Sequence, residues 1–430
     1  MRLEKAAPLT DDAFDDLMTR FAPFEARPAI AVAVSGGGDS MALAALAKTW
    51  ADRRGGSACA VIVDHGLRPE AAEEAATVAD RCQALDLKST ILVWTGDKPD
   101  RGIQAAARHA RYRLLTEACR NAGILHLLVA HHADDQAETV ALRVERDSML
   151  TGLAGMSALL EWRDLRLLRP LLPVSKARLL ATATARGLRW IEDPSNLNVA
   201  FARGRLRRSR AALPDAGVVA DRQRQRQANE TQTAADLAAA VAIMPVGNAL
   251  LDLGVWRKFD DRRRQEVVAH TAMTVGGLAF APRRAALLSF CERLDDDGAF
   301  SRTTLGRCLW RRKGGKLLIC RENRGLPESR PLGPGVTERW DGRYVVSTLA
   351  SGVSVGPLGA DGYRQLADTR VIQGVPREIA VVLPAFSDLE GLAAVPYLHW
   401  TRGGVGSGRD KATFAPQHPL APAGFLPSAA

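Results

Sequence analysis

Long apolar runs and paired cysteines are both missing from the sequence. No stretch of the 430 residues approaches the roughly 20 apolar residues that a membrane-spanning helix needs, and residues 1–16 are charged, without the apolar centre of a signal peptide. We therefore expect a cytoplasmic protein with no membrane contact. The absence of any Cys-x-x-Cys pair argues against a disulfide framework, a zinc ribbon and an iron–sulfur site. The six cysteines are Cys59, Cys82, Cys119, Cys291, Cys308 and Cys320.

Acidic residues are scarce in two segments that are rich in arginine. The whole chain has a formal net charge of +10. Residues 201–230 contain eight arginines against three acidic residues, and residues 301–324 contain six arginines and two lysines against one glutamate. Clustered arginine indicates a polyanionic partner, with RNA or DNA first among the candidates. The alternative is a solvated surface without a partner.

The first 145 residues alternate strand-like and helix-like segments. This alternation predicts an α/β fold in which right-handed crossovers build a parallel, Rossmann-like sheet with helices on both faces. The expected strands are Ala29–Val34, Ala58–Val63, Lys88–Trp94 and His126–Ala130. The expected helices are Met41–Trp50, Pro69–Ala84, Ile103–Ala122 and one that begins near Ala133.

Three polar motifs each follow one of the expected strands. They are "SGGGDS" (35–40), "DHGLR" (64–68) and "HHADDQAET" (131–139). Ligands of open α/β sheets bind beyond the carboxyl ends of the strands, so we expect the three motifs to converge on one site. Asp64 and His65 would then border the ligand, although an Asp-His pair at a strand end can also be a plain turn.

The glycine-rich motif lacks the residues that define two common phosphate loops. No G-x-x-x-x-G-K-[ST] Walker loop occurs in the chain, and Met41 stands where the third glycine of G-x-G-x-x-G would be. What remains is a strand-to-helix turn whose glycine amides and hydroxyls can bind phosphate oxygens. Asp39 cannot favour an anion directly, so we expect it to help hold a Mg²⁺ ion that neutralises the phosphates. The alternative is a turn that needs glycine only for its geometry.

At these residues the chain resembles the N-type ATP pyrophosphatases, whose PP-loop binds ATP during cleavage between the α- and β-phosphates. The resemblance implies ATP and Mg²⁺ as cofactors and a nucleotide site that Asp64 and His65 border. The loop residues that it assigns to ATP binding are Ser35, Gly36, Gly37, Gly38, Asp39 and Ser40.

The third motif distinguishes among the families that share the PP-loop, because residues 131–139 resemble the second signature of the tRNA(Ile)-lysidine synthetases. Further segments of that family follow in the same order, and the last of them supplies its paired arginines, Arg203 and Arg207. The resemblance covers roughly residues 29–210. The further segments are "GLAGM" (152–156), "RPLLPVSK" (169–176), "IEDPSN" (191–196) and "FARGRLR" (201–207).

Two positions depart from the family pattern. Residues 145–148 read Glu-Arg-Asp-Ser where the family has a glycine-rich R-G-S-G segment, and Gly204 replaces the asparagine that follows the first arginine. Both departures affect local loop geometry and neither removes a charged catalytic group. The i,i+4 spacing of Arg203 and Arg207 directs both side chains the same way, which suits phosphate binding, although a solvated helix face has the same spacing.

The residues of the third motif also make chemical sense by themselves. Asp135, Glu138 and Thr139 fall within about one helical turn of each other, which gathers two carboxylates and a hydroxyl. The alternative is that the acids only cap the helix and complement its dipole. A zinc site built on His131 and His132 is disfavoured, because adjacent side chains point apart.

The resemblance implies a ligase that uses ATP to activate the C2 oxygen of the wobble cytidine in the CAU anticodon of tRNA(Ile). The side-chain amine of L-lysine then replaces AMP and forms a C–N bond. The carbonyl oxygen on C2 is a poor leaving group, which explains why ATP is needed. The resemblance assigns catalysis to Asp39, His132, Asp135 and Arg203, with Asp39 holding the metal through the phosphates.

The tRNA would bind through phosphates to the helical middle of the chain and to a basic hairpin. Residues 308–322 read as two alternating runs around a Gly-Gly turn, which predicts that hairpin. Residues assigned to tRNA binding are Arg207, Arg311, Arg312 and Lys313.

Three other functions remain open on the sequence. The first is 2-thiolation of a tRNA cytidine by another PP-loop enzyme, which usually requires catalytic or cluster-binding cysteines. The second, a synthetase coupled to an amidotransferase, lacks an evident glutaminase segment. The third is an RNA-binding protein with a degenerate nucleotide fold, which the intact Ser35, Asp39, His132 and Asp135 disfavour.

The expected organisation is a catalytic domain, a helical domain and a small C-terminal region. We place the PP-loop domain at residues 1–210, a mostly helical tRNA-binding domain at 211–300, the hairpin with a small C-terminal domain at 301–410, and a disordered tail at 411–430. The oligomeric state stays open, with a homodimer among the options.

Overall fold

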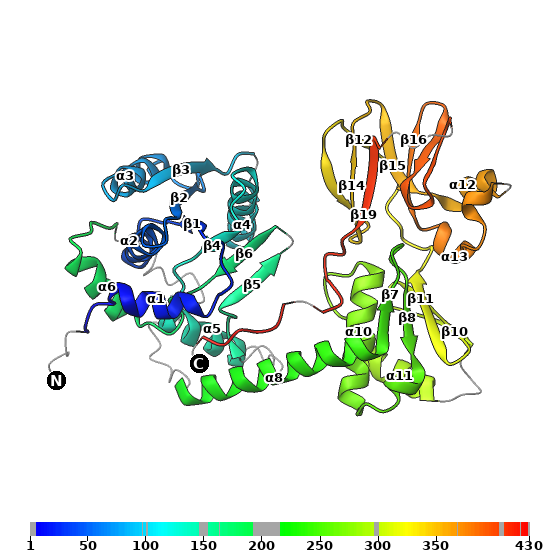
Figure 1. Ribbon diagram of the computed structural model, residues 1–430, viewed down its shortest axis with the longest axis horizontal. Helices are drawn as coiled ribbons and strands as arrows, with labels where there is room; N and C mark the ends of the chain where they lie inside the picture. Colours follow the sequence, from blue (N-terminus) through cyan, green and yellow to red (C-terminus); the bar gives the residue numbers. More distant parts are fainter. Residues whose placement is uncertain are drawn as a thin grey trace. The chain divides into compact units, whose positions relative to one another are not determined.

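The chain forms two units in the computed structural model (Figure 1). Met1–Asn229 and Ala423–Ala430 make up the first unit, and Glu230–Pro422 makes up the second. The structure describes residues 6–96, 98–99, 102–145, 154–162, 164–191, 216–295, 301–367, 369–403, 408–421 and 423–428. Among these residues, no helix has both the length and the apolarity needed to cross a membrane.

The first unit contains a six-stranded sheet whose first five strands are parallel. Only β5, at one edge, runs antiparallel to its neighbour β6. The parallel α/β fold predicted from the sequence is therefore confirmed. The order is β3 (Lys88–Val93), β2 (Ser57–Asp64), β1 (Ala29–Ala33), β4 (His126–Leu128), β6 (Leu165–Leu168) and β5 (Leu159–Trp162).

Helices pack on both faces of this sheet because successive side chains of β1 point to opposite sides. Ile30 and Val32 join one apolar core, and Ala31 and Ala33 join another. The first core receives side chains from α1 (Asp11–Thr19), α2 (Gly38–Asp52), α3 (Ala71–Gln83) and α6 (Lys176–Ala185). The second receives side chains from α4 (Ile103–Asn121). The described residues also form α5 (Ala133–Glu145) and α8 (Ala216–Ala240), whose last residues belong to the second unit.

The order of the strands creates a switch point between β1 and β4. From β1 the sheet continues through β2 and β3 on one side and through β4 on the other. In open α/β sheets, ligands bind at such a point, beyond the carboxyl ends of the strands, here β1 and β4. The loop 34–37 and residues 129–132 lie there.

The second unit begins with an antiparallel sheet that contains the predicted hairpin. Residues 308–322 form β10 (Cys308–Lys313) and β11 (Lys316–Arg321), in agreement with the sequence pattern. Two helices, α10 (Asp261–Gly276) and α11 (Arg284–Asp295), share a core with one face of the sheet. The other strands are β7 (Val241–Ile243), β8 (Ala249–Asp252) and β9 (Arg302–Leu305), in the order β7-β8-β11-β10-β9.

From the sequence we expect residues 211–300 to form a helical domain separate from the hairpin, but the structure joins the two in one sheet. β7 and β8 come from that segment, and β8 pairs directly with β11. The physical reason is that a two-stranded hairpin alone cannot bury an apolar face, and Ala249 and Leu251 of β8 supply buried side chains beside it. The division between the units lies at residues 229–230, not at residue 210.

The rest of the second unit consists of two small sheets and short helices. One sheet has the order β12 (Arg330–Leu332), β15 (Val353–Pro357), β16 (Pro384–Asp388), β17 (Gly391–Val395) and β18 (Trp400–Thr401). The other consists of β13 (Thr337–Trp340), β14 (Tyr344–Thr348) and β19 (Asp410–Phe414). Helices α12 (Gly359–Leu366) and α13 (Arg377–Ala380) lie between β15 and β16 in the chain.

The C-terminal residues differ from the expected disordered tail. β19 pairs with β14 along its whole length, and Phe425 is buried within the first unit. Two phenylalanines, Phe414 and Phe425, lie in a stretch whose glycine, proline and alanine content suggests disorder. Their apolar contacts offset the entropy cost of ordering the segment.

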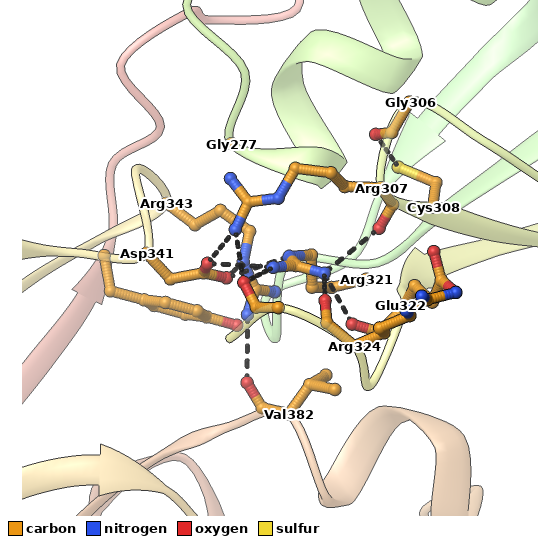
Figure 2. Close-up of polar contacts among 12 residues, drawn as sticks. Gly277, Gly306, Arg307, Cys308, Arg321, Glu322, Arg324, Asp341, Arg343 and Val382 are labelled. Carbon is orange, nitrogen blue, oxygen red and sulfur yellow. Dashed lines mark hydrogen bonds and ion pairs between the residues drawn. The ribbon is translucent and has the colours of Figure 1, made fainter. Parts of the chain in front are cut away.

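A buried carboxylate joins the parts of the second unit (Figure 2). Asp341, in the turn between β13 and β14, has a fully buried side chain that contacts three arginines. Its oxygens lie 2.7 Å from Arg307 Nη2, 3.1 Å from Arg321 Nε and 2.7 Å from Arg343 Nε. Arg343 Nη2 also donates to the Val382 carbonyl oxygen at 2.9 Å. The cluster therefore ties the hairpin sheet to the β13–β14 turn and to the segment before β16.

Removal of this carboxylate should destabilise the second unit. Asp341→Ala leaves Arg321 and Arg343 buried without their anion, a change that typically costs roughly 3–5 kcal/mol of unfolding free energy. Urea unfolding followed by tryptophan fluorescence measures the loss. The control is Asp361→Ala, because Asp361 forms an ion pair with Arg364 on the surface and its side chain is 91% exposed. A loss at Asp341 no larger than the control's would contradict the assignment.

Candidate active site

The loop after β1 is shaped by glycines that serve two different purposes. Gly36 has a φ of +85°, and a Cβ there would lie 2.4 Å from Val78 Cγ2. A Cβ on Gly38 would lie 2.6 Å from Leu180 Cδ2, so both positions exclude larger residues by packing. Gly37 caps α2, and a Cβ there would meet only Ser35 Oγ, at 3.9 Å. The open side of the loop at Gly37 thus presents the N-terminus of α2, where an anion is favoured.

Ser40 closes the loop from inside. Its hydroxyl donates to the Gly37 carbonyl oxygen at 2.9 Å and accepts from the Ser35 backbone N–H at 3.2 Å. The two hydroxyl oxygens of Ser35 and Ser40 are 3.3 Å apart. Ser40 is buried, and the hydrogen bonds of its hydroxyl are to residues of the loop itself. Ser35 lines a cavity. Direct binding of ATP by these side chains stays a prediction.

A cavity of about 520 Å³ lies beside the loop, at the carboxyl ends of β1 and β2. This volume is in the usual range of small-ligand sites. Ser35, Asp64 and His65 all line the cavity, so the first two motifs do converge. Asp64 accepts the Gly66 backbone N–H at 2.7 Å, which fixes the turn after β2. Burial lowers the pKa of His65, and the nearby charge of Arg111 lowers it further, so His65 is neutral at neutral pH.

Arg111 is a cavity residue that the sequence interpretation missed. It reaches the cavity from α4, where burial lowers its pKa without removing its charge. Among the described residues, no acidic side chain forms an ion pair with it. A signal was present in the sequence: Ala107, Arg111 and Leu115 follow at intervals of four, so a cation stands in the apolar face of a helix. A half-buried guanidinium that has no acidic partner among the described residues favours an anionic ligand.

His132 joins the glycine-rich loop to the third motif. Its imidazole is buried, and Nε2 lies 3.5 Å from both Asp39 Oδ2 and Asp135 Oδ2. Nδ1 lies 3.5 Å from Asp134 Oδ2. Asp135 also accepts the His132 backbone N–H at 3.2 Å, at the start of α5. The expected convergence of Asp39, His132 and Asp135 is therefore present in the structure.

The three carboxylates control the charge of this histidine. Burial by itself lowers the pKa of His132, but hydrogen bonds to Asp134 and Asp39 and the charge of Asp135 outweigh it and raise the pKa to about 9. The same hydrogen bond lowers the pKa of Asp134 to about 2, helped by the Lys176 backbone N–H, which Asp134 accepts at 2.8 Å. At neutral pH the site thus contains an imidazolium surrounded by carboxylates. Asp134 also fixes the start of α6.

Asp39 fits the expected role of a metal ligand. Its Oδ1 atom is buried and has no hydrogen-bond partner among the described residues, while Oδ2 faces His132. Carboxylate oxygens are the ligands that Mg²⁺ prefers, and Mg²⁺ commonly takes its other ligands from phosphates and water. In the described part of the chain, no group of three or more His, Cys, Asp or Glu side chains forms a complete metal site. His131 points elsewhere than His132, because its Nδ1 accepts from Arg169 Nε at 3.3 Å.

Gln136 has a role that the sequence did not reveal. Its buried amide donates to the Met156 carbonyl oxygen at 2.9 Å and accepts the Met156 backbone N–H at 2.7 Å. It therefore fixes part of the "GLAGM" segment to the first turns of α5. The Thr139 hydroxyl donates to the Asp135 carbonyl oxygen at 2.8 Å, a contact within the helix. Glu138 is buried on the same helix.

Several residues predicted to belong to the site lie outside the described residues. Arg203, Gly204 and Arg207 lie outside the described residues, and so do positions 146–148 of the first departure from the family pattern. The structure does not test the roles that we expect for the two arginines.

The three basic residues of the hairpin do not form one patch. Arg311 points to the face of the sheet that carries Leu309, and its Nη2 forms an ion pair with Glu378 at 2.7 Å. Because side chains alternate along a strand, Arg312 points to the opposite face, the one that carries Trp310. Lys313 is exposed beside the Gly-Gly turn.

Comparisons with known proteins agree with this geometry. Residues 10–212 match the PP-loop domain family. The chain is 36% identical over 377 residues to the tRNA(Ile)-lysidine synthase of Rhizobium meliloti, a match that covers 84% of this chain and 83% of the relative. It is 38% identical over 379 residues to the enzyme of the same name from Mesorhizobium japonicum, covering 83% and 81%.

A third relative matches over a shorter length. The tRNA(Ile)-lysidine synthase of Rhodopseudomonas palustris is 52% identical over 189 residues, which cover 44% of this chain and 55% of that protein. The match therefore spans about half of the length of the Rhodopseudomonas palustris protein.

The raised pKa of His132 predicts how stability depends on pH. The folded protein binds a proton with a pKa of about 9, whereas an unfolded histidine titrates near 6.5. The stabilisation, on the order of 3 kcal/mol, is fully present below about pH 6.5 and is lost as the pH rises through about 9. Urea unfolding of the metal-free protein between pH 6 and 9.5 should show this decline relative to His132→Gln. Parallel pH profiles of the two proteins would contradict it.

Proposed function

Because the chain belongs to the tRNA(Ile)-lysidine synthase family, we propose that it forms lysidine at the wobble cytidine of a tRNA(Ile) with a CAU anticodon. ATP and L-lysine are the other substrates, and AMP and pyrophosphate are the further products. The observation that carries the proposal is the contact of His132 with both Asp39 of the PP-loop and Asp135 of the third motif. This contact supports the proposal, because adenylation followed by amine attack requires a phosphate-binding loop and an acidic group close together.

The cavity beside the PP-loop is the proposed site of the adenosine part of ATP. Its lining includes Ser35, Asp64 and His65, and the polyphosphate would extend over Gly37 toward the N-terminus of α2. Asp39 would hold Mg²⁺ through Oδ1, and the bound ion would neutralise phosphate charge. We assign Arg111 to an anionic group of the bound substrates, since its charge has no acidic partner in the described residues.

The first chemical step joins the cytosine to AMP. The C2 oxygen attacks the α-phosphorus, the bond to the bridging oxygen breaks, and pyrophosphate leaves with the bonding electrons. Negative charge develops at the α-phosphate in the transition state, and cations preorganised at that place lower the barrier. Arg203 keeps the predicted role of such a cation.

The second step replaces AMP by lysine. The side-chain amine attacks C2, the bond from C2 to the activated oxygen breaks, and AMP leaves with that oxygen. The amine loses a proton, which needs an acceptor nearby. His132 is already protonated at neutral pH because its pKa is about 9, so we assign the acceptor role to Asp135. His132 then serves to hold Asp39 and Asp135 in position.

The anticodon base is accessible to such a site because it is unpaired. A base in a loop can leave the stack and enter a pocket. We propose that phosphate contacts from the second unit bind the rest of the tRNA, with Arg312 and Lys313 as candidate contacts and Arg311 restrained by Glu378. The chain's net charge of +10 supports a polyanionic substrate.

The thiolation alternative is less well supported. It would need reactive or cluster-binding thiols, but five of the six free cysteines are buried and only Cys59 is partly exposed. Burial raises the pKa of Cys82 to about 11 and the pKa values of Cys119, Cys291 and Cys320 to about 12. Thiols with such pKa values are poor nucleophiles.

Removal of the carboxylate charge of Asp135 or of Asp39 should abolish most lysidine formation. We expect Asp135→Asn to lower the incorporation of radiolabelled lysine into CAU tRNA(Ile) at least 100-fold with ATP affinity within a few-fold, because the proton acceptor is lost. Asp39→Asn should lower incorporation equally and also weaken Mg²⁺-dependent ATP binding. Glu117→Gln, on an exposed part of α4 with 56% of its side chain accessible, is the matched control. Incorporation within a few-fold of wild type in Asp135→Asn would mean that the site is misplaced.

Replacement of basic hairpin residues by neutral ones should weaken the binding of tRNA and leave the binding of ATP unchanged. For the double variant Arg312→Ala, Lys313→Ala we expect a three- to ten-fold higher KM for tRNA with unchanged ATP affinity. The slope of log KM against log salt should also decrease, by about one for each lost phosphate contact. Arg364→Ala is the control, since 76% of its side chain is exposed on α12, where it forms an ion pair with Asp361 of the same helix. Equal loss of tRNA and ATP affinity would argue against the hairpin as an RNA contact.

A further inference from the structure

Residues 423–428 lie in the first unit although the 193 residues before them form the second unit. The chain leaves the first unit through α8 and returns to it at Ala423. In Figure 1 the red C-terminal segment accordingly ends within the first unit. The returning residues are anchored by both apolar and polar contacts.

The apolar anchors are Phe425 and Leu426. Phe425 is 2% exposed, and the guanidinium of Arg226 lies 4.4 Å from its ring centroid. Leu426 packs against the main core of the first unit. A buried phenylalanine contributes roughly 1.5–3 kcal/mol, so the segment has a specific reason to dock.

The polar anchors connect the segment to residues 154–158. The Leu426 carbonyl oxygen accepts the Ala158 backbone N–H at 2.8 Å, and the Leu426 N–H donates to Ser157 Oγ at 3.0 Å. The buried side chain of Gln223 accepts the Ser428 N–H at 2.9 Å and donates to the Ala154 carbonyl oxygen at 3.2 Å. The segment thus contacts Ser157 and Ala158 directly and Ala154 through Gln223.

Arg20 fixes the last described residues of the segment. Its two terminal nitrogens donate to the carbonyl oxygens of Pro427 at 2.6 Å and Ser428 at 2.7 Å. These contacts orient the backbone of the segment at the end of the stretch that touches residues 154–158.

Residues 154–158 are held from the other side by Gln136. The paired hydrogen bonds between the Gln136 amide and Met156 lie one residue away from Asp135 and within one turn of His132. Gly155 has a φ of +72°, and a Cβ there would lie 2.7 Å from Gln136 Oε1, so the two segments are in close contact. A continuous set of contacts therefore runs from Leu426 through residues 156–158 to the first turn of α5.

We propose that residues 423–428 are positioning residues for the active site: they hold residues 154–158 against Gln136 and so fix the turn of α5 that carries His132 and Asp135. The proposal rests on the proposed function for its effect on catalysis. Among the described residues, those that line the nucleotide cavity differ from the hydrogen-bond partners of Leu426, Pro427 and Ser428. Loss of the segment should therefore impair the chemistry and leave ATP binding intact.

The first test compares the full chain with a chain that ends at Pro422. We expect kcat for lysine incorporation to fall at least ten-fold, with the dissociation constant for ATP within two-fold of the full chain. A synthetic peptide of residues 423–430, added in trans, should restore kcat. An unchanged kcat would overturn the proposal. A parallel loss of ATP affinity that the peptide does not restore would also overturn it, since that result indicates general unfolding.

A point variant keeps the test meaningful if the shortened chain folds poorly. Phe425→Ala removes the apolar anchor and should lower kcat in the same direction, by at least three-fold, without a change in ATP affinity. Phe280→Ala is the matched control, because Phe280 is 84% exposed in the second unit. Equal kcat values for the two variants would contradict the proposal.

Hydrogen exchange separates this proposal from the proposed function. In the shortened chain we expect faster exchange in residues 132–139 and 154–158 than in the full chain, whether or not lysine is a substrate. A full chain that incorporates no lysine but shows this difference would refute the proposed function and keep the positioning role. Unchanged exchange in both stretches would refute the positioning role, whatever the activity of the full chain.

Discussion

The buried positive charge of His132 is the interaction on which the candidate site depends. A desolvated imidazolium is costly unless carboxylates surround it, and here Asp39, Asp134 and Asp135 do so. Asp39 lies in the first turn of α2, the helix after β1, and the other two lie in α5, the helix after β4; β1 and β4 pair in the sheet. Asp134 extends the arrangement to α6 through Lys176. The starts of three helices are thereby fixed around one proton, and the stability and geometry of the site are linked.

The α/β core and the convergence of the motifs could be predicted because both follow from local patterns. Short apolar runs locate both ends of each strand from β1 to β4 within two residues, and polar residues after parallel strands must share one edge of the sheet. Arg111 and Gln136 were not identified in the same way. Their roles depend on which residues face them in space, the cavity for Arg111 and Met156 for Gln136. Spacing within a helix shows only that such a residue lies on a buried face.

The second unit shows why arginine content overstates an RNA-binding surface. Residues 301–324 carry a large positive excess, yet Arg307 and Arg321 from this stretch bind the buried Asp341, together with Arg343 (Figure 2). Arg311 pairs with Glu378, and the alternation of the strand separates it from Arg312. The hairpin itself was predictable from its pattern, but the partners of its arginines come from residues 341 and 378. Only the tertiary structure shows which carboxylates these arginines contact.

The limits of a motif-bearing domain and the limits of a folding unit are different in this chain. The PP-loop family match ends at residue 212, and every described residue of the candidate site precedes residue 140. The first unit nevertheless includes Gln223 of α8 and Phe425, Leu426 and Ser428. Without these late residues, Ser157 and Ala158 would lose their hydrogen bonds to Leu426, and Ala154 would lose its hydrogen bond to Gln223. A fragment chosen by its motifs would therefore contain the chemical groups and lack part of the support that orients them, since precise orientation of catalytic groups relies on the surrounding shell of contacts.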